Sequence, residues 1–531
     1  MNSTPSPRLR SKALIVLLCI FAAFIAVYWI MRYGGWAMEG DAMRMTLSGE
    51  GILVEGQLAP QRYTYAAGHG YPALLAVLSY CTGASVQTLQ LITAVWLVVF
   101  VLVAFVTYRE LLGGTAVAVV GAFLLLLQPD FVFHVLRSSH EKATWLFGLL
   151  LLFLLVRSYR YVMLPARFAV HVLLFYLVFL AMVTSNTYFA STFLTALVLS
   201  FIGGSILLVW DRRGTQEQKG RGALQRLLIV SLACSVIVFT FINFLYPPAV
   251  ELYRTLSHIG DRLSLLLLGA EQVTTRPYER VATAWRSTGI YLSLTAAQWL
   301  IVLCSLGAWL SRARHLVRKG DRSLSSGKRL LWLLYGGFAF QLAMGTVVDL
   351  AGALSANLQL RLFVPFSLLA SPMAAPILLR GLRVLWRKDQ RLRFAASWFI
   401  VILVCCLVVA SLLKSTNDPS VGNLWIFYSP AELHAGQWSD RHLKNRSVWV
   451  DTFSHHQDVL EFRSGYAQER RNRYVLGKQD APFSHVLISR LTRLQANRSS
   501  LALPGVVTHN CVYDNGEAQL YHRRPLTPYQ R

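Results

Sequence analysis

Charged residues, and acidic residues above all, are scarce in this chain of 531 residues. Only 15% of the residues are charged, with 26 Asp and Glu against 51 Lys and Arg, while 55% are hydrophobic. Together with a mean hydropathy of +0.46, this composition excludes an ordinary soluble or disordered chain. The net charge of +25 would indicate nucleic-acid binding only if it lay on one soluble face, so its distribution decides its meaning.

Paired cysteines and the motifs of soluble enzymes are missing as well. The seven cysteines form no C-x-x-C pair, and all but Cys511 lie in or beside apolar runs, which is typical of buried small residues and of neither a zinc site nor a disulfide framework. The sequence has no Walker loop, no H-E-x-x-H and no G-x-S-x-G, and the missing Walker loop argues against an ATP-driven pump. Acids inside the apolar runs are nearly absent, with Asp349 at the end of one, which weakens the case for an ion-coupled transporter.

Long apolar runs, in contrast, are plentiful. Crossing a ~30 Å hydrocarbon core takes roughly 20 helical residues, and eleven stretches that approach or reach this length recur over the first 413 positions. Two of them, 114–128 and 143–157, are so short that they must extend into their flanks or sit beside a thinned, protein-filled region. The sequence therefore predicts a polytopic α-helical membrane protein with about eleven transmembrane helices. The eleven stretches lie near 13–31, 86–108, 114–128, 143–157, 167–184, 188–209, 227–246, 290–310, 330–349, 361–380 and 394–413.

The excess positive charge falls in the loops on one side of these spans. With the N-terminus inside, the inner loops carry 25 Lys and Arg and five acids, whereas the outer loops and span ends carry 11 basic and 11 acidic residues. The positive-inside rule therefore predicts a multi-pass protein of the cell (inner or plasma) membrane with a cytoplasmic N-terminus and an extracytoplasmic C-terminus. We interpret the basic runs 311–319 and 380–388 as inner loops that contact anionic headgroups of the bilayer, and we expect no nucleic-acid partner.

Two domains are predicted, a transmembrane domain over 1–413 and a small soluble extracytoplasmic α/β domain over 414–531. Outer loops at 32–85, 129–142 and 247–289 interrupt the first domain. The apolar stretches 71–81 and 262–268 are too short to span, so we expect them to lie as lids on the outer bilayer surface. In the second domain, 447–450 and 485–488 are expected to be short strands, and Asn515-Gly516 between alternating flanks predicts a hairpin.

Acids collect at the predicted outer ends of the spans. Asp41 follows the first span, and Glu141 ends the connection between the third and the fourth. A carboxylate at the bilayer edge, near arginines, is suited to act as a general base on an acceptor hydroxyl while a lipid-borne leaving group lies in the membrane. We predict Asp41 and Glu141 as catalytic carboxylates, with solvated loop acids as the alternative, and Asp130 as a helix-terminating or capping residue.

Cations and aromatic residues near these acids are the candidates for binding a phosphorylated donor and its acceptor. A departing phosphate needs cations where its charge develops, for which we predict Arg137, Arg361 and Arg62. Arg137, four positions before Glu141, falls on the same face if that stretch is helical, and snorkelling to headgroups is the alternative for Arg361. The candidates for substrate or acceptor contacts are Tyr63, His69 and Tyr71.

The motifs and their order resemble the GT-C superfamily of polyprenyl-phosphate-dependent glycosyltransferases. Gly40-Asp41 follows a first span, and Gly70-Tyr71-Pro72-Ala73-Leu74 enters an interfacial helix. A Gln128-Pro129-Asp130 turn precedes Arg137 and Glu141, and Arg361-x-x-x-Pro365 opens a late span. In layout the resemblance covers residues 1 to about 413, and the most similar relatives are the protein mannosyltransferases, aminoarabinose transferases and oligosaccharyltransferases.

This resemblance implies an inverting transfer of a sugar, a hexose or pentose, from a polyprenyl phosphate to a glycan, lipid or protein acceptor of the cell envelope, on the extracytoplasmic side. By position, Asp41 is the first-loop catalytic carboxylate. Glu141 is the second-loop carboxylate that in some relatives helps hold a divalent metal, so Mg²⁺ or Mn²⁺ at Asp41 and Glu141 is a possible cofactor. Two departures bear on the metal: Ala42 stands where many relatives have Glu, and Glu141 stands where Asp is common. A flippase or carrier, or a polymerase or ligase, for lipid-linked saccharides remains the alternative.

Overall fold

The computed structural model describes most of the transmembrane domain and part of the small domain. Arg62, Tyr63 and most of the segment 247–289 lie outside the described residues, so the predictions made for them stay predictions. The described residues are 7–32, 40–58, 69–137, 139–210, 218–245, 257, 260–261, 264, 288–319, 326–350, 358–386, 390–415, 429–443, 448–451, 472–474, 484–498, 502–503 and 509–523.

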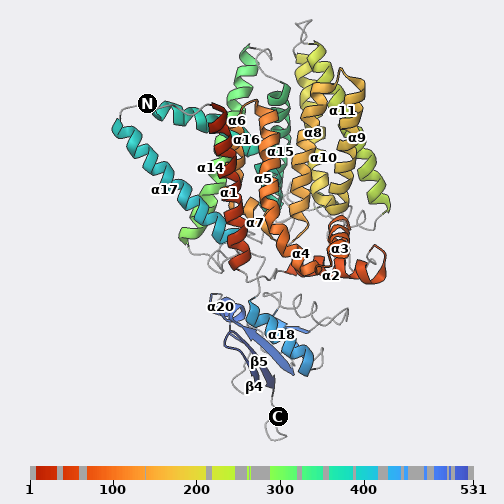
Figure 1. Ribbon diagram of the computed structural model, residues 1–531, viewed down its shortest axis with the longest axis vertical. Coiled ribbons are helices and arrows are strands. Elements are labelled where there is room, and N and C mark those ends of the chain that lie inside the picture. The colour runs from red at the N-terminus through yellow and green to blue at the C-terminus, as the bar shows by residue number, and fades with distance from the viewer. Residues whose placement is uncertain are drawn as a thin grey trace.

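The first part of the chain is a bundle of helices, and each of the eleven predicted spans coincides with one helix or, for 86–108, with a run of three consecutive helical elements. Within the described ranges, nine helical segments are long and apolar enough to cross a membrane, and α6 with α7 counts as a tenth if this bent pair is one span. The remaining predicted span falls on the 28-residue helix α11. The polytopic helical fold is therefore confirmed (Figure 1). Its helices are α1 (Pro7–Arg32), α2 (Gly40–Glu55), α3 (Gly70–Thr82), α4 (Val86–Ile92), η2 (Thr93–Val95), α5 (Trp96–Leu112), α6 (Thr115–Leu126), α7 (Pro129–Leu136), α8 (Glu141–Tyr161), α9 (Pro165–Ser185), α10 (Thr187–Trp210), α11 (Gln218–Leu245), α14 (Thr288–Lys319), α15 (Ser326–Leu350), α16 (Leu358–Trp386) and α17 (Gln390–Ser415).

The short predicted span 114–128 ends in a sharp bend. Proline at 129 disfavours helical geometry at Gln128, whose backbone is extended (φ −91°, ψ 109°), and it fits the first position of a new helix because it needs no N–H partner there. The chain turns by 76° between α6 and α7. The predicted outer loop 129–142 is therefore mainly helix α7, which lies against the ends of its neighbours. The other short span, 143–157, extends into its flanks as α8, as expected.

Three prolines inside α16 shape the centre of the bundle. Pro372 has no N–H to donate to the carbonyl four residues earlier, and the hydroxyl of Tyr108 on α5 donates to this Leu368 carbonyl at 2.6 Å instead. Gly121 on α6 packs against Pro372 in the same place, where a Cβ atom would lie 3.4 Å from the Pro372 Cα and 3.1 Å from the Tyr108 ring. Helices α5, α6 and α16 therefore approach one another closely along this line.

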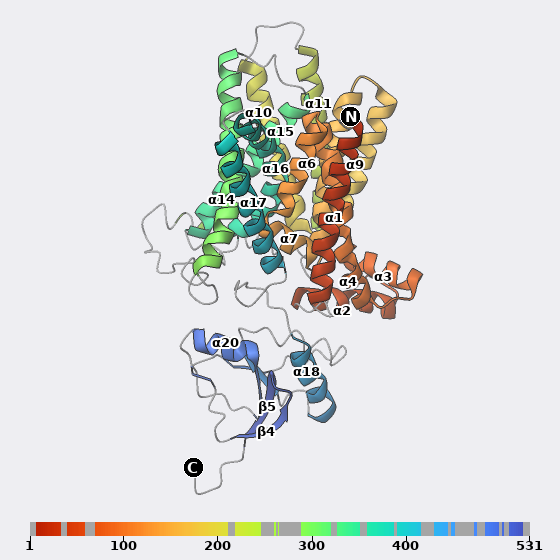
Figure 2. The same cartoon turned by 60° about the vertical axis from the view of Figure 1, so that its left-hand side comes forward.

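The predicted interfacial helix 71–81 is present as α3. It is too short to span, and together with α2 and α4 it lies at the end of the bundle that faces the small domain (Figures 1 and 2). Gly70 allows α3 to begin directly against the end of α9, because a Cβ atom there would lie 2.7 Å from the Thr184 hydroxyl.

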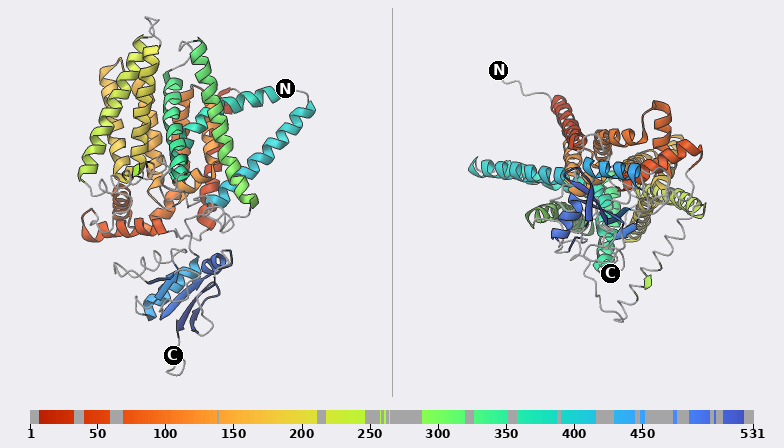
Figure 3. Two further views of the ribbon diagram at one scale, coloured as in Figure 1. Left: turned by 180° about the vertical axis from the view of Figure 1, so that it is seen from behind. Right: turned by 90° about the horizontal axis from the view of Figure 1, so that it is seen from below.

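The C-terminal part contains the small α/β unit expected from the sequence. Its five-stranded sheet has the order β2-β1-β3-β5-β4, parallel between β2, β1 and β3 and antiparallel for the rest. The hairpin turns at Asn515 and Gly516, whose φ of 87° favours glycine. Figure 3 shows this unit as separate from the bundle. Its elements are α18 (Pro430–His442), β1 (Val448–Asp451), β2 (Asn472–Tyr474), β3 (His485–Ser489), α20 (Arg490–Arg498), β4 (His509–Asp514) and β5 (Ala518–Arg523).

Candidate functional site

A cluster of buried charged and polar side chains lies where α7 meets the start of α8 and the end of α17. Each of its members is less than 10% exposed, although the surrounding bundle is apolar. Burying charge is costly unless the groups are paired and hydrogen-bonded, so such a cluster marks a place with a specific role. Its members are Asp130, His134, Arg137, His140, Glu141, Lys142 and Lys414.

Glu141, the first residue of α8, lies at the centre of this cluster. Its Oε1 atom is 3.3 Å from Nη2 of Arg137 and 4.0 Å from Nδ1 of His134. Arg137 thus lies beside Glu141, but the two do not share a helix face, because Arg137 has left the helix (φ −56°, ψ 146°). Arg137 is fixed further by a bond from Nε to Ser139 Oγ at 3.1 Å and by the ring of Phe133. The other oxygen, Oε2, is buried without a hydrogen-bond partner among the described residues.

Asp130 has a different role from the predicted one. It lies in the first turn of α7, where the positive end of the helix dipole stabilises a negative charge. It neither ends nor caps a helix. Its carboxylate pairs with Nζ of Lys414 at 3.2 Å and accepts a hydrogen bond from the side-chain amide of Gln298. This pair joins α7 to the last turn of α17, next to Trp29 of α1, which donates to the Ser415 carbonyl at 3.1 Å.

Asp41 is the second residue of α2, and its side chain lies outside what the structure describes. The backbone that follows it is held, since the carbonyl of Ala42 accepts a hydrogen bond from the side-chain amide of Gln90 at 2.8 Å. Helix α2 packs on α3 and α4, at the end of the bundle that faces the small domain (Figure 1).

The start of α3 brings two predicted substrate residues to this end. Tyr71 is fully buried. Burial raises the pKa of its phenol, and the negative charge of Glu141 raises it further. His69 precedes the helix and is half-buried, and partial burial lowers the pKa of its imidazole.

Arg361 lies in the first turn of α16 with an exposed side chain. Helix α16 packs against α7, which carries Asp130 and His134 of the cluster. Asp349 at the end of α15 caps this helix by accepting hydrogen bonds from the backbone N–H groups of Leu358 (3.2 Å) and Gln359 (2.7 Å). A cation at a helix N-terminus adds to the positive end of the helix dipole, which favours an anion there.

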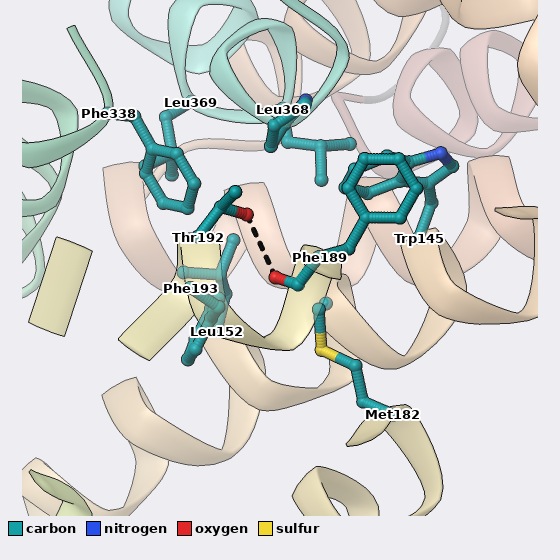
Figure 4. Close-up of a pocket in the computed structure, with 11 residues that line it drawn as sticks. Trp145, Leu152, Met182, Phe189, Thr192, Phe193, Phe338, Leu368 and Leu369 are labelled. Carbon is teal, nitrogen blue, oxygen red and sulfur yellow. Dashed lines mark hydrogen bonds between the residues drawn. The ribbon is translucent and has the colours of Figure 1, made fainter. Parts of the chain in front are cut away.

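An apolar pocket lies directly behind these charges, among α8, α9, α10, α15 and α16. The space among these side chains is small, with room for about one water molecule. Thr192 in its lining donates its hydroxyl to the Phe189 carbonyl at 2.8 Å, so this hydroxyl is satisfied (Figure 4). The pocket is lined by Trp145, Gly148, Leu152, Met182, Phe189, Thr192, Phe193, Phe338, Pro365, Leu368 and Leu369.

The side chains described around Glu141 do not complete a ligand set for Mg²⁺ or Mn²⁺. Such ions prefer several oxygen ligands, and no group of three or more His, Cys, Asp or Glu within reach of one ion is found in the described part of the chain. One oxygen of Glu141 is already engaged by the Arg137 cation. A metal at Asp41 and Glu141 therefore stays a prediction, and no chemical step is derived from it.

Sequence reasoning missed Lys142, Lys414 and Gln90. Lys142 is fully buried one residue after Glu141, and Lys414 is buried at the end of an apolar helix. A lysine at the end of a predicted span is the ordinary signal of a snorkelling residue, so the pairing with Asp130 was hidden. Gln90 lies within an apolar run, where an amide needs a partner, and this was the one local signal available.

Comparison with known proteins finds similarity in fold but none in sequence family. No protein-family model matches the sequence, and no curated protein matches it. The fold is similar to that of the oligosaccharyltransferase of Archaeoglobus fulgidus tethered with an acceptor peptide, with a TM-score of 0.55, 12% identity, and coverage of 97% of this chain and 74% of that chain. The archaeal oligosaccharyltransferase AglB from Archaeoglobus fulgidus, in complex with an inhibitory peptide and a dolichol-phosphate, gives a TM-score of 0.52 at 11% identity, covering 91% and 70%. ArnT from Cupriavidus metallidurans gives 0.48 at 12%, covering 94% and 97%. The fold of this chain is therefore similar to that of the oligosaccharyltransferase structures.

Proposed function

We propose that this chain is an integral membrane glycosyltransferase. It moves a sugar from a polyprenyl phosphate to an acceptor on the extracytoplasmic side, with inversion at the anomeric carbon. Asp41 is the general base. Arg361 binds the donor phosphate, and Arg137 lies close to it and orients Glu141. Arg62, Tyr63, His69 and Tyr71 are proposed to contact donor or acceptor.

The observation that carries this proposal is the change from charge to apolar surface along single helix faces. On α8, Glu141 is followed one turn later by Trp145 and then by Gly148, and both of the latter line the pocket. On α16, Arg361 is followed at the same spacing by Pro365 and Leu368 of the pocket. Residues four apart share a helix face. These two helix faces therefore present a charged end followed by an apolar surface, as a molecule with an anionic head and an apolar tail requires.

The proposed reaction is a single nucleophilic displacement at the anomeric carbon. The acceptor hydroxyl or amide attacks the anomeric carbon while the Asp41 carboxylate takes its proton. The bond between this carbon and the phosphate oxygen breaks, and the phosphodiester monoanion leaves as a polyprenyl phosphate with one additional negative charge. Arg361 and the N-terminus of α16 stabilise that charge as it develops, and the buried Arg137 holds Glu141 in place.

The side of the membrane follows from helix direction. Glu141 begins α8, which ends near Arg157 and Arg160, and Arg361 begins α16, which ends near Arg380 and Arg383. The site is thus at the end of these helices opposite to their arginines, and the positive-inside rule places such arginines in the cytoplasm. The polyprenyl phosphate is supported by the dolichol-phosphate in the AglB complex, whose fold this chain shares.

The test is Asp41→Asn in the full-length protein, measured as transfer from a radiolabelled polyprenyl-phosphate sugar. General-base catalysis contributes about 10²- to 10⁴-fold, so we expect activity to fall by at least about 10²-fold with normal membrane insertion. Glu50→Gln on the same helix is the matched control and keeps full activity. An Asp41→Asn protein as active as the wild type contradicts the proposed base.

A deletion strain separates transfer from transport. Mass spectrometry of its lipid-linked sugars and outer glycans is expected to show accumulation of a monosaccharide polyprenyl phosphate. Accumulation of assembled repeat units indicates a flippase, polymerase or ligase instead and overturns the proposal.

A further inference from the structure

A chain of buried hydrogen bonds connects the residue after Asp41 with the residue after Glu141. It consists of the side chains of Thr46, Gln90, Thr93 and Lys142 and ends on the Ala42 carbonyl, and we call it the Gln90 brace. All four side chains are at most 4% exposed. Hydrogen bonds in a low-dielectric interior are stronger than those in water, so the brace ties its two ends together.

The α2 half of the brace has three short hydrogen bonds. The amide nitrogen of Gln90 donates to Thr46 Oγ1 at 2.6 Å and to the Ala42 carbonyl at 2.8 Å. Thr46 also donates its hydroxyl to the Ala42 carbonyl at 3.0 Å. The peptide that directly follows Asp41 is therefore held from two directions.

The α8 half starts from Lys142. Its ammonium donates to Thr93 Oγ1 at 2.7 Å and lies 3.4 Å from the Gln90 carbonyl. Thr93 connects Lys142 with Gln90, because its hydroxyl donates to the same Gln90 carbonyl at 2.6 Å. Lys142 is the second residue of α8, so this half fixes the helix turn that carries Glu141.

The end points of the brace distinguish it from ordinary packing. A hydrogen-bond network that only stabilised α2 and α4 could end anywhere on these helices. This one ends at the residue next to each of the two predicted catalytic carboxylates, which are 100 positions apart in the chain.

We propose that Gln90, Thr93 and Lys142 are positioning residues that set the spacing between Asp41 and Glu141 in the transfer reaction. This inference rests on the proposed function. Displacing a reacting group by about 1 Å can cost about 10²-fold in rate, so loosening the brace lowers kcat while donor binding, measured as KM, changes little.

The experiment compares Gln90→Met and Thr93→Val with Thr107→Val in the full-length protein. Thr107 is also fully buried, and its hydroxyl donates to the Leu149 carbonyl at 3.3 Å, so its loss matches Thr93→Val in kind but lies outside the brace. We expect kcat to fall by about 10- to 10²-fold for the two brace variants and to stay unchanged for Thr107→Val, with similar unfolding midpoints for both threonine variants. Thr93→Ser, which keeps the hydroxyl, restores kcat.

A double-mutant cycle with Asp41→Asn separates positioning from structure. If Gln90 acts through Asp41, then Gln90→Met has no further effect in the Asp41→Asn background. An equal loss in both backgrounds, or an unchanged kcat in Gln90→Met, overturns the brace while the proposed function stands. Full activity of Asp41→Asn instead overturns the proposed base, and with it the proposed role of the brace.

Discussion

The buried pair of Asp130 and Lys414 gives a sharp prediction for stability. The two side chains are 3% and 4% exposed, and Lys414 Nζ lies 3.2 Å from Asp130 Oδ1. At an effective dielectric constant of about 20, Coulomb's law gives an attraction of about 5 kcal/mol at this distance. Taking the two ions out of water costs several kcal/mol each, so the attraction is largely offset and the pair contributes little net stability.

Removing only one partner leaves this desolvation cost without the attraction. We expect Lys414→Met to lower the free energy of unfolding by about 3–5 kcal/mol, as for other broken buried pairs. The double variant Asp130→Asn/Lys414→Met lacks both charges and keeps an acceptor for the Gln298 amide. Because it leaves no unpaired charge, we expect it to recover most of this loss.

The assay is denaturant-induced unfolding in detergent micelles, followed by tryptophan fluorescence. Arg160→Met is the matched control, because Arg160 also contacts an acid, Glu110, at 2.6 Å but is 48% exposed. Exposed pairs contribute about 0–1 kcal/mol, and Arg157 lies 3.7 Å from the same carboxylate. The reasoning is refuted if Lys414→Met is no more destabilising than Arg160→Met, or if the effects of the single variants at 130 and 414 simply add.

Two further predictions concern the packing of the bundle and the entrance of α3. Tyr108→Phe leaves the Leu368 carbonyl without the partner that replaces the missing N–H of Pro372, so we expect the free energy of unfolding to fall by about 1–3 kcal/mol. The measurement is the same denaturant-induced unfolding, with Tyr80→Phe at an exposed position as the control. Equal stability of the Tyr108→Phe and Tyr80→Phe proteins contradicts this role of Tyr108. Burial lowers the pKa of His69, so the unfolded chain binds more protons and stability falls as the pH drops through the unfolded value of about 6.5. The melting temperature of His69→Gln should therefore change less than that of the wild type between about pH 7.5 and pH 5.5, and an identical pH profile of the two proteins speaks against it.

The helical bundle was predictable because each span is a long apolar run, and such a run has few alternatives in a membrane. The strongest local signals also held: Pro129 ends α6, and Asn515-Gly516 forms the hairpin between β4 and β5. Sequence order and loop charge predicted the spans without any knowledge of how they pack.

The site was predictable only in part, because it is built from helix ends that are distant in the sequence. The four-residue spacing of Arg137 and Glu141 indicated a shared face if the stretch were helical, whereas the structure brings the two together without a helix between them. Nothing in the sequence tells that the end of α17 meets the start of α7, where Lys414 pairs with Asp130. The brace was missed for the same reason, because Thr46, Gln90 and Lys142 come from three helices.

The scarcity of acids within the spans bears on the choice between transfer and transport. A carrier that moves a lipid-linked saccharide across the bilayer must accommodate the polar head at every depth, and polar groups in a membrane interior are costly unless they serve such a path. In the described part of α8, α10 and α16, the charges at Glu141 and Arg361 give way within one turn to a pocket lined by Trp145, Phe193, Phe338 and other apolar residues. At the far end of α8, Glu110 of α5 is engaged by Arg157 and Arg160. This arrangement gathers the charges at the two ends of these helices and leaves the part between them apolar, so it agrees with the proposed transfer better than with transport.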